Sequence, residues 1–161
     1  MKRMKTKDVF VASFHEWSTH KPVDQITVGE ICTNCEYSTT TFYRHFTDKY
    51  DLIAYDYTSH IASFMKKINN EYSWREAMQE GVAYLSSQKA YLKNLFKHTK
   101  GQDSFFFYMS TVNIHYLTEI ILKAMNQAEL TRPLDLAVKI YCYGYAQVIC
   151  DWILGELRCS S

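Results

Sequence analysis

The sequence predicts an all-α protein, on three observations. Glycine and proline are scarce, with 5 Gly and 2 Pro in 161 residues, and Pro22 and Pro133 lie far apart, which favours long uninterrupted helices. Apolar residues recur at helical spacing, whereas the strict alternation typical of β-strands is missing from the sequence. A hydrophobic content of 47% with 22% charged residues is that of a globular protein with a sizeable core.

The first expected helix covers residues 6 to about 20. Phe10, Phe14 and Trp17 are spaced by four and three residues, which places them on one face. Pro22 ends this helix, because the residue before a proline avoids helical backbone angles.

Two short helices, 28–34 and 38–45, are expected next, joined by a three-residue turn. Thr27 and Glu30 form a capping box for the first, and Ser38 caps the second. Short helices joined in this way are typical of a helix-turn-helix.

Longer helices follow. Thr47 or Asp48 caps a helix over 49–69, and breaks rich in polar residues, glycine or proline separate the rest. These further helices are expected at 73–87, 89–99, 103–127 and 133–157. We place the boundary between two domains, 1–53 and 54–161, near the start of the helix at 49–69.

The first 53 residues carry a pattern in three parts: Ile26–Cys32, Ser38–Phe46, and Asp48–Lys49 with Leu52–Ile53. This pattern resembles the DNA-binding signature of the TetR family of transcriptional regulators. Within that family, the segments 21–28, 41–43 and 48–53 most resemble regulators of the dihydroxyacetone-kinase type. The resemblance implies a TetR-like fold: an N-terminal three-helix helix-turn-helix DNA-binding domain, followed by a helical bundle for effector binding and dimerisation.

The second helix of a helix-turn-helix lies in the major groove and reads bases near its N-terminus, here with Ser38, Thr39 and Thr40. The resemblance implies that phosphate contacts come from further residues, and helix N-termini also offer backbone amides to phosphate. These residues are Lys7, Thr27, Val28, Tyr43, His45 and Lys49. Thr41, Phe42 and Phe46 are interpreted as packing residues, with Thr41 able to bond back along its helix.

Two positions depart from the family pattern. Glu36 stands where the family usually has glycine, and Thr39 stands where a basic residue is frequent. A non-glycine residue in a left-handed turn costs about 1–3 kcal/mol, which surrounding packing can offset.

The net charge gives no general attraction to nucleic acid. It is +1 for the whole chain, and residues 1–53 hold seven Lys or Arg against seven Asp or Glu. DNA affinity must therefore come from the positions of individual cations. These cations are Lys2, Arg3, Lys5 and Lys7 at one end, and Arg44 and Lys49 at the other.

The second half is rich in aromatic residues, and two interpretations stay open. They form an ordinary bundle core with a dimer interface, or several line an apolar effector pocket between helices. The residues expected to line such a pocket are Phe64, Tyr84, Tyr108, Tyr116 and Tyr145.

Nothing in the sequence indicates an enzyme, a metal or a cofactor. Cys32 and Cys35 have the spacing of a zinc half-site but lack a second pair, so we expect them to be packing residues, and five cysteines do not form a disulfide framework. Histidine spacing fits no metalloprotease motif, and no glycine-rich phosphate loop occurs. Without a signal core or an apolar run of about 18 residues, a cytoplasmic location without membrane contact is expected.

The expected function is that of a homodimer that binds a palindromic double-stranded DNA operator and is controlled by a signal in the C-terminal domain. That signal is a small-molecule effector or a co-activator protein. A protein-interaction module without DNA binding is the rival hypothesis. Relatives usually carry one further helix after the position of Gly155, so we expect a C-terminal truncation, with the last helix at 133–157 sustaining the dimer.

Overall fold

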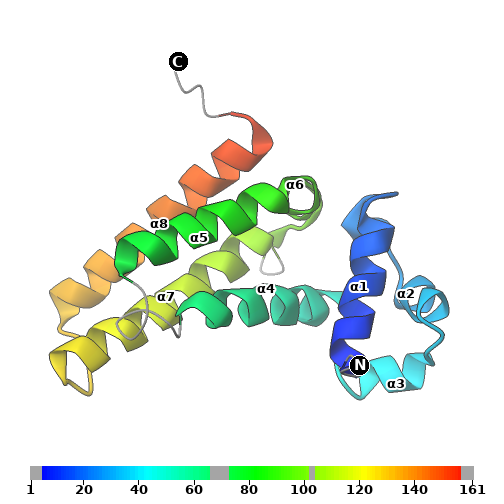
Figure 1. Cartoon of the computed structure of the whole chain (residues 1–161), viewed down its shortest axis with the longest axis horizontal. Helices are drawn as coiled ribbons and strands as arrows, with labels where there is room; N and C mark the ends of the chain where they lie inside the picture. The colour runs from blue at the N-terminus through cyan, green and yellow to red at the C-terminus, as the bar shows by residue number, and fades with distance from the viewer. Residues whose placement is uncertain (1–4, 66–72, 102–103, 157–161) are drawn as a thin grey trace.

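The computed structural model describes residues 5–65, 73–101 and 104–156, without the side chains of Phe64 and Trp74. Within these ranges the chain is all-helical, which confirms the predicted fold class (Figure 1). The elements are α1 Thr6–Ser18, η1 Val23–Gln25, α2 Val28–Asn34, α3 Thr39–Tyr43, α4 Lys49–Met65, α5 Trp74–Ser87, α6 Lys89–His98, α7 Phe105–Met125 and α8 Arg132–Leu154.

Helices α1, α2 and α3 gather at one end of the molecule, which we call the head (Figure 1). Phe10 on α1 is fully buried there, and its ring meets that of Phe42 on α3 edge to face, with centroids 5.2 Å apart. The Ser13 hydroxyl on α1 donates to the Ile31 carbonyl of α2 at 2.8 Å. These contacts hold the three helices together as one unit.

Helix α4 leads from the head into a bundle with α5–α8, which we call the body (Figure 1). Helices α7 and α8 make the most extensive contact between any two elements. The predicted domain boundary after residue 53 falls inside α4, which belongs to both parts.

Several helix ends differ from the predicted ones. Helix α1 ends at Ser18, whose hydroxyl donates to the His15 carbonyl at 2.6 Å, and the short helix η1 was not predicted. Helix α7 begins at Phe105 because the Ser104 side chain caps it, and it ends where Asn126 adopts a left-handed conformation. Residues 66–69, 103 and 157 of the predicted helices lie outside the described residues.

None of the described helices is long and apolar enough to cross a membrane.

Candidate nucleic-acid interface

Local capping defines the two short helices of the head. The Thr27 hydroxyl accepts from the Glu30 amide at 3.2 Å, while the Glu30 carboxylate accepts from the Thr27 amide at 2.8 Å. The Ser38 hydroxyl accepts from the Thr41 amide at 3.1 Å. Both predicted caps are confirmed. The Thr41 hydroxyl forms a 2.9 Å hydrogen bond with that of Ser38 instead of bonding back along α3.

The turn between α2 and α3 is built on a left-handed residue, Glu36, with φ of 59°. The Tyr37 amide donates to the Cys32 carbonyl at 3.0 Å, and the Glu36 amide donates to the Thr33 carbonyl at 3.3 Å. This pair of bonds is the Schellman motif, which closes a helix and normally uses glycine. The turn therefore keeps its geometry with glutamate at the glycine position.

Helix α3 separates a packing face from an exposed face. Phe42 is fully buried and Phe46 nearly so, as predicted. Thr39 and Thr40 are exposed, and Tyr43 is 58% exposed although it is large and aromatic. The Phe42 ring meets the Tyr43 ring edge to face at 5.5 Å, so a buried aromatic residue supports an exposed one.

Lys49, the predicted phosphate contact on α4, has two acceptors within the protein. Its Nζ donates to the Asp24 carbonyl at 2.6 Å and to the Ile26 carbonyl at 2.8 Å. Burial lowers the pKa of this ammonium. An ammonium has three N–H donors, so Lys49 ties α4 to the segment before α2 and has a third donor for a phosphate.

The remaining predicted DNA contacts surround this unit. Lys7 places its ammonium over the Phe46 and Tyr55 rings, 5.0 and 4.7 Å from their centroids. His45 is half-buried beside Phe10. Arg44, one of the cations from which DNA affinity is expected, is exposed at the C-terminal end of α3 next to Tyr43.

The N-terminus of α2 is partly occupied. The Thr27 amide is bound by the Glu30 carboxylate, which also accepts from Lys21 Nζ at 2.5 Å. The hydrogen bonds from Lys21 and Thr27 lower the pKa of Glu30 to about 2. Because the Thr27 amide already donates to this carboxylate, Val28 is better placed than Thr27 to offer an amide to a phosphate.

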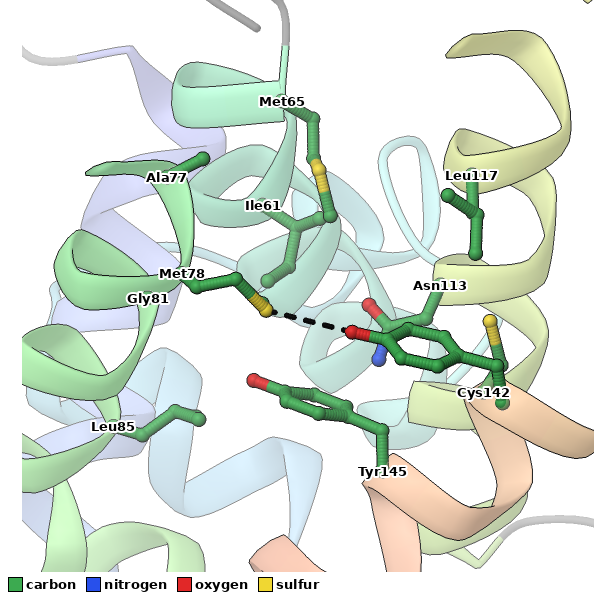
Figure 2. A pocket seen from close by; sticks show the side chains of 11 residues that line it. Ile61, Met65, Ala77, Met78, Gly81, Leu85, Asn113, Leu117, Cys142 and Tyr145 are labelled. Atoms are coloured by element: carbon green, nitrogen blue, oxygen red, sulfur yellow. Dashed lines mark hydrogen bonds between the residues drawn. The ribbon is translucent and has the colours of Figure 1, made fainter. Parts of the chain in front are cut away.

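The body contains a small cavity where α4, α5, α7 and α8 meet (Figure 2). Its volume is about 30 Å³, far below the roughly 300–1,000 Å³ of a typical ligand pocket. The Nδ2 of buried Asn113 has no hydrogen-bond partner, and the Tyr141 hydroxyl donates to Met78 Sδ at 3.6 Å. The lining residues are Ile61, Met65, Ala77, Met78, Gly81, Leu85, Asn113, Leu117, Tyr141, Cys142 and Tyr145.

Of the five predicted effector-pocket residues, Tyr145 lines this cavity. Tyr84 stacks on His60 with centroids 4.7 Å apart, and the Tyr108 hydroxyl donates to the Ala54 carbonyl at 2.9 Å. Tyr116 packs half-buried against the core. The side chain of Phe64 lies outside the described residues.

The described residues contain no group of histidine, cysteine or acidic side chains that could hold a metal ion. Cys32 and Cys142 are buried. Burial raises the pKa of both thiols, that of Cys142 to about 11. They are neutral packing residues at physiological pH.

A head with the α2–turn–α3 unit, carried on α4 into a helical body, is the TetR-like fold that the motif resemblance implied. The structure is similar to a solved one, that of the dihydroxyacetone kinase operon activator DhaS, with a TM-score of 0.68 at 14% sequence identity. The similarity covers 94% of this chain and 85% of the other. Comparison with protein-family models and with curated proteins finds no match.

Proposed function

We propose that this protein is a sequence-specific DNA-binding transcriptional regulator that binds a palindromic operator as a homodimer. The observation that carries the proposal is the exposed face of α3 on a firmly packed head. Thr39, Thr40 and Tyr43 project outward, while Phe42 anchors the same helix in the core. Exposed side chains on a rigid helix are what reading a DNA groove requires.

The proposed roles follow from position. Ser38, Thr39 and Thr40, at the N-terminus of α3, face base edges, and Tyr43 contacts phosphate. Lys7, His45, Lys49 and the start of α2 at Thr27 and Val28 add contacts to the DNA backbone. Arg44 joins this set because it is exposed beside Tyr43.

The proposed homodimer interface is an apolar stripe on α8. Leu136, Ile140 and Tyr143 are spaced by four and three residues and therefore share a face, and they are 58%, 65% and 41% exposed. Helix α7, which packs against α8, also has exposed apolar side chains near its two ends, Phe107 and Met125. Large apolar side chains gathered on one surface are typical of an interaction site, and a second copy of this chain offers a matching face.

The signal is proposed to act in the body, as a small-molecule effector or as a co-activator protein. The cavity beside Tyr145 and Asn113 is the candidate for a small effector, although its volume of about 30 Å³ requires the walls to move. Met65 and Met78 form part of these walls, and methionine side chains repack easily. Control by a partner protein is the alternative that the motif resemblance to dihydroxyacetone-kinase regulators implies.

A head that binds protein instead of DNA is the second candidate function. It is favoured by the balance of seven basic and seven acidic residues over positions 1–53. Such a module needs no counterion release, so its binding would lack the steep salt dependence of DNA complexes.

Fluorescence anisotropy tests the proposal. The probe is DNA from upstream of the protein's own gene, titrated across a salt series with the wild type, Tyr43→Ala and Lys123→Ala. Lys123 is exposed at the far end of α7, so its replacement removes a cation remote from the head. Saturable, salt-sensitive binding to one palindromic segment that weakens only in Tyr43→Ala supports the regulator. Equal binding by all three proteins, or none at low salt, favours the protein-interaction module.

A further inference from the structure

One side chain of the body bonds to three backbone groups of the head. Asn94 on α6 donates through Nδ2 to the Ser18 carbonyl at 2.7 Å and to the Lys21 carbonyl at 2.9 Å. Its Oδ1 accepts from the Val23 amide at 3.0 Å. The side-chain amide of Asn94 thus links the end of α1 to the start of η1.

A second contact lies one helical turn away. Asp56 on α4 is buried, and its Oδ2 accepts from Nε2 of His15 on α1 at 2.7 Å and from the Tyr91 hydroxyl on α6 at 3.2 Å. The His15 ring stacks on the Tyr91 ring, with centroids 3.9 Å apart. Tyr91 and Asn94 are three residues apart, so they share the face of α6 that lies against α1.

These contacts connect the head to the body. Within the head, α1 holds α2 through the bond from Ser13 to Ile31 and holds α3 through the contact between Phe10 and Phe42. Helix α6 in turn packs against α5, α7 and α8. The direction in which α3 faces is therefore set by how α1 packs on α6 and on α4.

We propose that Asn94 and Asp56 are positioning residues for operator recognition, which fix the angle of the head relative to the body without touching DNA. The inference rests on the proposed function and deepens it. A dimer matches two half-sites only when its two reading helices keep a defined separation. Adding one base pair moves the half-sites by about 3.4 Å and rotates one of them around the DNA axis, so a firmly held head should reject altered spacings.

The test is a series of operators in which the half-sites are moved apart or together by one or two base pairs. Anisotropy gives the Kd of each for the wild type, Asn94→Ala, Tyr91→Phe and Lys93→Ala. Tyr91→Phe removes only the hydroxyl that bonds Asp56, and Lys93→Ala is the control because Lys93 is exposed on the same helix. A single half-site serves as the reference ligand.

The wild type and Lys93→Ala are expected to show one sharp spacing optimum. In Asn94→Ala the ratio between the best and the next spacing should fall about tenfold, the low end of what losing the three hydrogen bonds of Asn94 can cause. Tyr91→Phe should show a smaller fall, while binding to the single half-site stays within twofold. Equal spacing ratios in all four proteins, or an equal loss on the single half-site, would overturn the proposal.

A readout without DNA separates this inference from the proposed function. Hydrogen exchange of the backbone amides from Ser18 to Gln25 should be faster in Asn94→Ala than in Lys93→Ala, with unchanged protection in α7. If the wild type binds no operator but this exchange differs, the regulator proposal fails while the connection between α6 and α1 stands. Unchanged exchange in Asn94→Ala overturns the positioning role itself.

Discussion

The Nε2 of His15 on α1 lies 2.7 Å from the buried Oδ2 of Asp56 on α4. Burial raises the pKa of this carboxyl group, but the hydrogen bonds from His15 and His60 outweigh burial and lower the pKa to about 2. Asp56 is therefore ionised at neutral pH although it is 3% exposed. An ionised buried group with partners on three helices contributes to stability in a pH-dependent way.

Replacing Asp56 should remove part of the acid sensitivity of folding. Because its folded pKa lies below the ordinary 3.8, the contribution is present above pH 3.8 and is lost as the pH falls toward 2. The difference is worth about 2 kcal/mol in the free energy of unfolding. Urea unfolding at pH 7 and pH 3 should show a smaller loss of stability in Asp56→Asn than in the wild type, and equal losses would contradict this account.

His60 should make stability fall as the solution becomes alkaline. The hydrogen bond to the Asp56 carboxylate raises the pKa of His60 above 6.5. A raised pKa gives a contribution that is complete below pH 6.5 and is lost as the pH rises through the folded value. Between pH 6 and pH 9 the wild type should lose more stability than His60→Gln in urea unfolding, and the same loss in both proteins would contradict this assignment.

Replacement of Glu36 by glycine should stabilise the protein. Its φ of 59° is unfavourable for a residue with a Cβ and readily adopted by glycine. The expected gain in the free energy of unfolding is about 1 kcal/mol, after the greater entropy of unfolded glycine is subtracted. Thr33→Gly, inside α2, is the control and should destabilise slightly, because glycine is the poorer helix former. Destabilisation by both changes would show that no strain is stored at Glu36.

Much of the fold follows from the sequence because its signals are local. The capping box of Thr27 and Glu30 joins residues three apart, and so does the cap of Ser38 on Thr41. Helical periodicity likewise compares neighbours along the chain, which is why the order of the helices was predictable. The short helix η1 was missed because Asn94, more than 70 residues away, holds its first amide.

The candidate site was predictable only in part, for the same reason. The faces of α3 follow from its own period, so the burial of Phe42 and the exposure of Thr39 were foreseen. The carbonyl partners of Lys49 and the acidic partner of His15 lie 23 or more residues away in sequence. Only the three-dimensional packing brings them together, and no spacing rule indicates them.

Alanine at Thr39 and at Tyr43 should have different effects on DNA binding. Thr39 is proposed to face bases, so Thr39→Ala should change which base is preferred at one operator position, by about 1–3 kcal/mol of discrimination. Tyr43 is proposed to contact phosphate, so Tyr43→Ala should weaken binding to all sequences alike. A selection from randomised half-sites distinguishes the two. Identical base preferences in Thr39→Ala and the wild type would show that Thr39 does not contact bases.

A charge on the α8 stripe should separate the proposed dimer. Ile140 is 65% exposed in the isolated chain, so Ile140→Asp should leave the fold intact, but a carboxylate buried in an apolar interface loses its hydration without a partner. Sedimentation at micromolar concentration should show a dimer for the wild type and a monomer for Ile140→Asp with an unchanged circular dichroism spectrum. Val82→Asp is the control, because Val82 is 42% exposed on α5 and lies outside the stripe. If Ile140→Asp stays dimeric, or only Val82→Asp dissociates, the subunits meet through another surface and the two reading heads must be oriented differently.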